Sequence, residues 1–179
     1  MASTLYAIGP LPKSSSMTGH HMFWGCTNLK YVDTSSFSDI TNAYGMFQDC
    51  HNLVSEDTSV LNSDGSYYTL DLSNFSKVTN GEGMFRQCYS LKNLDLTKMT
   101  SLVDASNIFL DCTSLETVST KGLSSVTDID GLFSGCTSLK TIDLSSIGYT
   151  TDVTTVGTAF KGCTKLHKLL NVSKSVLSL

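Results

Sequence analysis

The sequence predicts an α/β solenoid in which six repeats of about 24 residues stack along one axis. The first observation is the spacing of the six cysteines, which are separated by 24, 38, 24, 24 and 27 residues. The second is a phenylalanine three residues before every cysteine, and the third is a leucine three residues after every one. A Phe-x-x-Cys-x-x-Leu motif at a nearly fixed period is typical of stacked repeats.

Further apolar columns place the repeats and their insertions. The repeats start near residues 22, 46, 84, 108, 132 and 159. The second repeat aligns with the others only when 14 residues are skipped, so we place a long insertion at 56–69; a three-residue insertion near Tyr149 explains the last spacing. The column six residues after the cysteine then reads Val32, Leu70, Leu94, Val118, Ile142 and Leu169.

Each repeat predicts one strand and one helical turn. The stretch Leu91-Lys-Asn-Leu94-Asp-Leu96 alternates apolar and polar residues, which indicates a short strand. The opposite half spaces its apolar residues at helical intervals and starts with a threonine that can cap free N–H groups. These threonines are Thr41, Thr79, Thr127 and Thr154. Stacking predicts a right-handed solenoid with a parallel sheet on the concave face and short helical turns on the convex face, with a period in the roughly 20–29 residues of leucine-rich repeats.

The two ends lie outside the regular pattern. We expect residues 1–21 to cap the first repeat and residues 22–179 to form the repeat domain. Residues 170–179 are apolar and predict a C-terminal cap. The alternative is an open strand edge through which the chain associates with itself or docks onto another subunit.

Charge and hydropathy restrict the partners. The formal net charge of −4 argues against nucleic acid, since phosphate neutralisation requires a basic surface. No segment approaches the roughly 18 apolar residues of a membrane span, so we expect no direct membrane insertion. The first ten residues lack the basic and apolar regions of a signal peptide.

The motifs resemble a known repeat class. Met84-Phe-Arg-Gln-Cys-Tyr-Ser-Leu-Lys-Asn-Leu-Asp-Leu96 and Leu132-Phe-Ser-Gly-Cys-Thr-Ser-Leu-Lys-Thr-Ile-Asp-Leu144 are similar to BspA-like leucine-rich repeats, including those of bacterial and mycoplasma surface lipoproteins. The resemblance covers residues 22–170. It implies an extracellular or surface location and binding of host or partner proteins. We expect neither a signal peptide nor a lipobox cysteine from this sequence, which would be a departure from the family pattern.

The cysteines offer three possible kinds of chemistry. No Cys-x-x-Cys motif or Cys–His cluster has the spacing of metal ligands. Each cysteine shares the inward register of a phenylalanine and a leucine, which favours a ladder of buried thiols over disulfides. We therefore expect no metal, no disulfide and no cofactor.

Two surfaces are candidate ligand-binding sites. On the concave face we expect an aspartate column with flanking polar residues, namely Asp33, Asp71, Asp95 and Asp143 with Tyr31 and Asn93. Such a face suits a basic segment, a glycan or a cation; the alternative is a solvated strand face whose composition the repeat imposes. In the insertion, Asp64-Gly65 indicates a hairpin turn, and Tyr67 and Tyr68 are residue types favoured at interfaces. The alternative here is a tolerated surface loop.

These patterns predict a protein without catalytic activity. No Gly-x-Ser-x-Gly, His-Glu-x-x-His or phosphate-loop motif occurs, and none of the four histidines belongs to a catalytic motif. The predicted function is a recognition or adhesion module that binds a protein or glycan through the concave face and the hairpin. The alternative is a structural, decoration or receptor-binding subunit of a larger assembly such as a phage particle or a filament.

Overall fold

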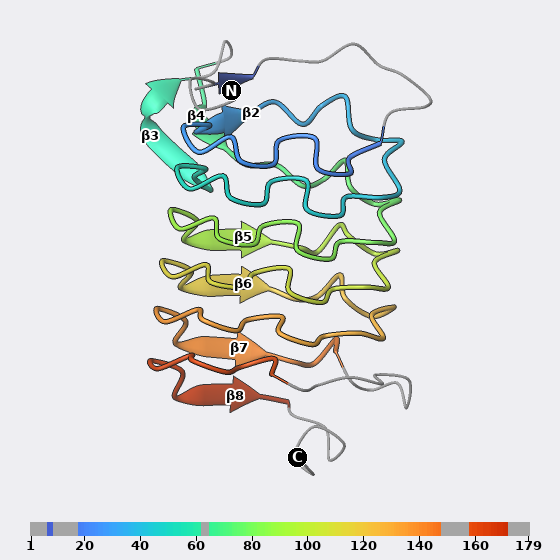
Figure 1. Cartoon of the computed structure of the whole chain (residues 1–179), viewed down its shortest axis with the longest axis vertical. Coiled ribbons are helices and arrows are strands. Elements are labelled where there is room, and N and C mark those ends of the chain that lie inside the picture. Colours follow the sequence, from blue (N-terminus) through green and yellow to red (C-terminus); the bar gives the residue numbers. More distant parts are fainter. Residues whose placement is uncertain (1–6, 9–17, 62–64, 148–157, 172–179) are drawn as a thin grey trace.

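The chain forms a stack of coils, as a computed structural model shows for residues 7–8, 18–61, 65–147 and 158–171 (Figure 1). Strands β5 to β8 lie one below another along the same side of the stack (Figure 1). The strands are β1 (Ala7–Ile8), β2 (Tyr31–Val32), β3 (Glu56–Leu61), β4 (Tyr67–Thr69), β5 (Asn93–Asp95), β6 (Thr117–Ser119), β7 (Thr141–Asp143) and β8 (Lys168–Leu170).

The strands pair in the register that the repeat predicts. Strands β5 and β6 are parallel with Leu94 opposite Val118, and β7 and β8 are parallel with Ile142 opposite Leu169. Strand β1 pairs in parallel with β2 and is the part of the predicted 1–21 cap that the structure describes as a strand. The 56–69 insertion contributes an antiparallel hairpin of β3 and β4, with an irregularity between Asp57 and Leu61. The residues near Tyr149 and those after Asn171 lie outside the described residues.

The phenylalanine of the motif forms a continuous stack through all six repeats. Adjacent ring centroids are 5.3–5.8 Å apart, and the interplanar angles do not exceed 17°. The four inner rings are fully buried. The stack consists of Phe23, Phe47, Phe85, Phe109, Phe133 and Phe160. Because each inner ring buries both faces against its neighbours, the column forms the centre of the hydrophobic core.

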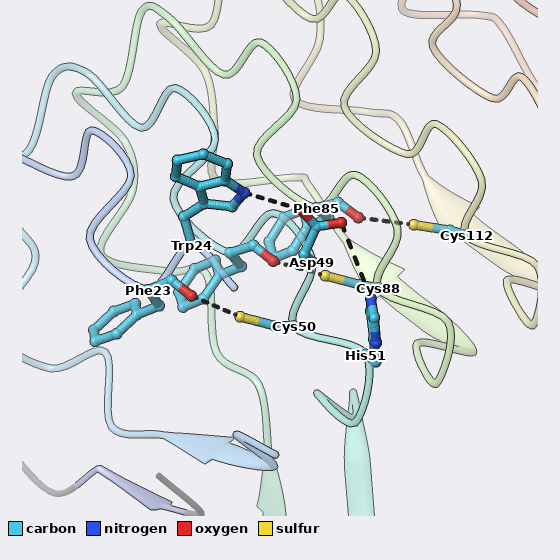
Figure 2. Close-up of polar contacts among 9 residues, drawn as sticks. Phe23, Trp24, Asp49, Cys50, His51, Phe85, Cys88 and Cys112 are labelled. Carbon is cyan, nitrogen blue, oxygen red and sulfur yellow. Dashed lines mark hydrogen bonds and ion pairs between the residues drawn. The ribbon is translucent and has the colours of Figure 1, made fainter. Parts of the chain in front are cut away.

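The cysteines form a second ladder beside the phenylalanines (Figure 2). All six are free thiols, and five are buried while Cys163 is half-buried. Each thiol after the first donates a hydrogen bond to the phenylalanine carbonyl of the preceding coil, at Sγ···O distances of 3.0–3.1 Å. Burial raises the pKa of Cys112 well above the ordinary thiol range, which keeps this donor protonated at neutral pH. The thiols therefore link neighbouring coils.

The predicted helical turns are wrong: none of the described residues belongs to a helix. On the side opposite the strands, alternate N–H groups donate to the next coil instead of to their own. Gly45 donates to Glu82, Phe47 to Met84 and Asp49 to Arg86, each at 2.9 Å. The residues in between close short turns, because the N–H of each donates to the carbonyl three residues earlier. An α-helix requires every N–H to bond four residues back, so Thr41, Thr79 and Thr127 do not begin helices. Thr154 lies outside the described residues.

Left-handed backbone at two positions per repeat also excludes a helix. The residue before each cysteine has a positive φ, between 59° and 78°. This column is Gly25, Asp49, Gln87, Asp111, Gly135 and Gly162. A second such column lies five residues before the cysteine in the first five repeats, with φ between 51° and 63°. Continuous right-handed helix is impossible through either column.

Within the described residues, no helix has the length and apolar character needed to cross a membrane.

Candidate functional site

The predicted aspartate column lies on the sheet face, where each carboxylate closes a local turn. The Oδ1 atom of Asp33, Asp71, Asp95 and Asp143 accepts the backbone N–H two residues later, at 2.7–2.9 Å. Such Asx turns fix the backbone where the chain leaves the strand. The column therefore has a structural role that the sequence did not indicate, and two of its members, Asp71 and Asp95, are exposed.

Two of these carboxylates are held in the charged form. The hydroxyl and the backbone N–H of Thr97 lower the pKa of Asp95. The side-chain amide of Asn171, followed by the backbone N–H of Ser145, lowers the pKa of Asp143. An aspartate whose pKa is lower in the folded than in the unfolded protein contributes its full stabilisation at a pH above its unfolded-state pKa, about 3.9. This stabilisation is lost as the pH falls through the pKa of the folded state.

We therefore expect Asp95→Ala to lower the free energy of unfolding by about 1 kcal/mol at pH 7, because two hydrogen bonds to the carboxylate are lost. The difference from the original protein should shrink as the pH falls below about 4. Asp95→Asn is the matched control, since it keeps an acceptor oxygen without the charge. Urea unfolding at pH 7 and pH 3 measures the effect; a loss in Asp95→Ala that does not change with pH contradicts it.

A shallow groove of about 520 Å³ lies over the sheet face of β5 and β6. Its lining includes two of the predicted residues, Asn93 and Asp95, together with the facing residues of β6. The Thr117 hydroxyl donates to Asn93 Oδ1 at 2.7 Å, and the hydroxyls of Thr97 and Ser119 are 3.1 Å apart. These contacts join the polar side chains of neighbouring coils into a pre-positioned surface.

The hairpin is anchored to the first coil by tyrosines. Tyr31 and Tyr68 are each only 7% exposed, which corrects the expectation that both offer contact area to a ligand. Their rings meet edge to face at 4.6 Å, and the Tyr68 hydroxyl accepts the backbone N–H of Val32 at 3.1 Å. Burial raises the pKa of Tyr68 to about 12. Tyr68 therefore supplies the acceptor for a backbone N–H of β2. Elsewhere in the stack, a neighbouring strand supplies such an acceptor.

A charged contact completes this anchor. The Tyr31 hydroxyl donates to Asp57 Oδ2 at 2.6 Å, and Lys30 forms an ion pair with the same carboxylate. Tyr67 is 52% exposed and presents part of its ring at the surface of the hairpin. Asp64, the third candidate there, lies outside the described residues.

A second column of Asx turns lies on the opposite side of the coils and was not identified from the sequence. Asn42, Asn80, Asp104 and Asp128 each accept the N–H two residues later at 2.9–3.0 Å, and their backbones form successive parallel bridges. The sequence signal is an Asn or Asp eight residues before the cysteine in the second to fifth repeats. Among the described residues, no three His, Cys, Asp or Glu side chains are placed to hold a metal ion.

The sequence analysis also missed an aromatic cluster on the first three coils. Its rings are His20, His21, Trp24, Tyr44, His51 and Tyr89. The rings form two groups, one of His20, His21, Trp24 and Tyr44 and one of His51 and Tyr89, with neighbouring ring centroids 4.3–5.1 Å apart. Asp49 connects the two groups. It accepts a hydrogen bond from Trp24 Nε1 at 2.9 Å and lies 4.0 Å from His51 Nε2 (Figure 2). The signal in the sequence was a residue that differs from those at the same position of the other repeats. The residue after the cysteine is threonine in four repeats, but His51 and Tyr89 in the second and third.

Comparison with known proteins agrees with this geometry. The model of the BspA type leucine rich repeat region matches residues 10–80 and 63–179, with six copies. A search of curated proteins finds no match. Among solved structures, a leucine-rich repeat protein from Bacteroides ovatus is 20% identical with a TM-score of 0.63, and the alignment covers 93% of this chain and 37% of that protein. The leucine-rich repeat protein of T. pallidum is 21% identical with a TM-score of 0.52, over 92% of this chain and 62% of that one.

At this level of identity, the two structures show a shared fold, and the present chain spans only part of the length of each. The family model, in contrast, spans nearly every residue of the chain. The chain therefore belongs to the BspA-type leucine-rich-repeat family.

Proposed function

We propose that this chain is a non-enzymatic recognition module that binds a protein or glycan ligand through its sheet face and the β3–β4 hairpin. The observation that carries the proposal is the shallow groove over β5 and β6, together with the exposed Tyr67 of the β3–β4 hairpin. An open groove of this kind suits the binding of an extended surface better than the enclosure of a small substrate. Family membership supports the general role, and an extracellular or particle-surface location is part of the same proposal.

Fixed side chains favour binding on this face. In β5 the pattern is exposed, buried, exposed, so Asn93 and Asp95 point outward while Leu94 anchors the strand in the core. Thr117 and Thr97 hold these two polar groups in place through hydrogen bonds. Groups that are already ordered lose little conformational entropy when a ligand binds.

Binding measurements on surface variants test the proposal. After a ligand is identified on arrays of matrix proteins and glycans, we expect Tyr67→Ala to lower its affinity by about tenfold, the effect typical of an interface anchor. Asp95→Asn, which keeps an acceptor for the Asx turn, tests the groove separately. Val103→Ala, at an exposed apolar side chain away from both surfaces, is the control. Unchanged affinity in both Tyr67→Ala and Asp95→Asn for every ligand found contradicts the proposal.

The exposed last coil favours a second candidate function, as a subunit of a larger assembly. Leu169 is 40% exposed, whereas Ile142, its partner in β7, is 1% exposed. Phe160, Cys163 and Leu166 of the same coil are only partly buried. Self-association through this coil predicts a larger species in sedimentation at high protein concentration, and Leu169→Ser should reduce it.

A further inference from the structure

The aromatic cluster is concentrated at one place on the molecule. It holds the single tryptophan of the chain and three of its four histidines. The cluster lies on the turns before the strands in the first three coils, apart from the groove over β5 and β6 and from the hairpin. The repeat core does not require it, because other repeats carry Gln, Arg, Leu, Ser or Lys at the position of Trp24 and Thr at the position of His51 and Tyr89.

Trp24 is exposed and fixed at the same time. Its side chain is 55% exposed, the largest value among the exposed large hydrophobic residues of the described chain. Its Nε1 donates to Asp49 Oδ2, and Asp49 has its own backbone fixed at φ 60° and bonded to Arg86 in the next coil. The His21 ring lies 4.9 Å from the indole at 33°. The indole is therefore pre-oriented before any ligand arrives.

Further polar groups lie next to Asp49, the hydrogen-bond partner of the indole. His51 lies beside Asp49, and the centroid of its ring is 4.7 Å from that of Tyr89. Burial and the neighbouring His20 lower the pKa of His21, so at pH 7 this imidazole is neutral and offers one donor and one acceptor. The cluster thus combines an exposed aromatic face with hydrogen-bonding groups of both kinds.

We propose that the aromatic cluster is a carbohydrate-binding site in which a pyranose ring stacks on the exposed face of Trp24 and its hydroxyl groups bond to the surrounding imidazole, phenol and carboxylate groups. The C–H groups on one face of a pyranose carry partial positive charge and are attracted to the electron-rich face of the indole. Sugar hydroxyls both donate and accept hydrogen bonds, which matches neutral histidine and tyrosine.

The composition of the surface favours a sugar over a protein partner. Protein interfaces bury a largely apolar centre of packed side chains. The exposed large hydrophobic residues of the described chain are Trp24, Tyr67, Tyr89, Val103 and Leu169. Neither aliphatic residue in this set belongs to the cluster, so the surface offers aromatic faces and polar edges without an aliphatic centre.

Titration of the whole chain with defined sugars tests the site. The probes are hexasaccharides of glucose, galactose, mannose and N-acetylglucosamine, and because the chain has one tryptophan, its fluorescence reports on the site directly. We expect at least one probe to shift that fluorescence. In calorimetry, Trp24→Ala should weaken binding by about tenfold or more, and Trp24→Phe should retain most of the affinity because it keeps a ring. Asp49→Ala should give an intermediate loss, because it removes the acceptor that fixes the indole.

Val103→Ala, at an exposed apolar side chain outside the cluster, is the control and should leave sugar affinity unchanged. Failure of all four sugars to bind overturns the proposal, as does a Trp24→Ala variant that is folded by circular dichroism and binds as before. Loss of sugar binding in Tyr67→Ala but not in Trp24→Ala moves the sugar site to the hairpin and also overturns it. If only a protein ligand depends on Trp24, the cluster is a protein interface instead.

Discussion

Phe109→Ala should lower the free energy of unfolding by about 3–5 kcal/mol, the usual cost of removing a fully buried phenylalanine. Phe109 lies between two parallel rings, with centroids 5.8 Å from Phe85 and 5.6 Å from Phe133. Both flanking coils pack on this ring, so their contacts weaken together when it is removed. Urea unfolding followed by circular dichroism measures the change.

Phe160→Ala is the control for this prediction. Phe160 stacks on Phe133 at 5.8 Å but is only partly buried, so its replacement should cost clearly less. Equal losses in the two variants contradict the idea that stacking on both sides determines the stability of the inner coils.

Gly122→Ala should destabilise the protein by about 3 kcal/mol, the upper end for overpacking in a close-packed interior. A Cβ at this position overlaps the Leu96 carbonyl oxygen of the preceding coil and lies 2.9 Å from the Thr97 backbone carbonyl. Both obstacles are backbone atoms that the hydrogen bonds between coils hold in place, so no side-chain movement relieves the clash. The melting temperature and the urea midpoint should fall together.

Two controls separate this clash from other effects of glycine replacement. Ser146 occupies the equivalent column in the next repeat, and Ser146→Ala should have little effect because the position already carries a Cβ. Gly25 has a φ of 71° with open space around it, so Gly25→Ala should cost only about 1 kcal/mol of backbone strain. A Gly122→Ala variant no less stable than Gly25→Ala contradicts the steric argument.

The sequence was sufficient to predict the repeat fold because its signal is repeated six times. Strand register followed directly from the columns: Leu94 and Val118 were aligned by their distance from the cysteine and lie opposite each other in β5 and β6. The cysteine column was assigned to the core for the same reason, and Cys50, Cys88, Cys112 and Cys136 are fully buried. What sequence alone did not supply was the hydrogen bond from each thiol to the coil before it, since that depends on how closely the coils approach.

The helical turns were wrong because apolar spacing alone does not separate a helix from a chain of tight turns. In Ala43–Cys50, tight turns bury the same apolar positions that a helix would bury. The backbone conformation, rather than the apolar spacing, distinguishes the two. Glycine, asparagine or aspartate recurs at the left-handed positions, as in Gly45, Asp49 and Asn107. That column was visible in the sequence and argues against continuous helix.

The candidate site was less predictable because tertiary contacts decide exposure. Tyr67 and Tyr68 are adjacent and chemically identical, yet one is 52% exposed and the other 7%, since alternate residues of β4 face opposite sides and only one side packs on Tyr31. The aromatic cluster was missed for a different reason. Aligning the repeats by the residues they share does not reveal Trp24, His51 and Tyr89, because these residues differ from those at the same positions of the other repeats.

The hydrogen bond between each thiol and the preceding phenylalanine carbonyl has a consequence for how this protein changes in evolution. An inner coil such as that of Cys112 donates to Phe85 of the coil before it, and the carbonyl of its own Phe109 accepts from Cys136 of the coil after it. Its two faces are therefore complementary to each other. A tandem duplication of one such coil creates a junction whose donor and acceptor already match, so the array can lengthen or shorten by whole units without new interface residues.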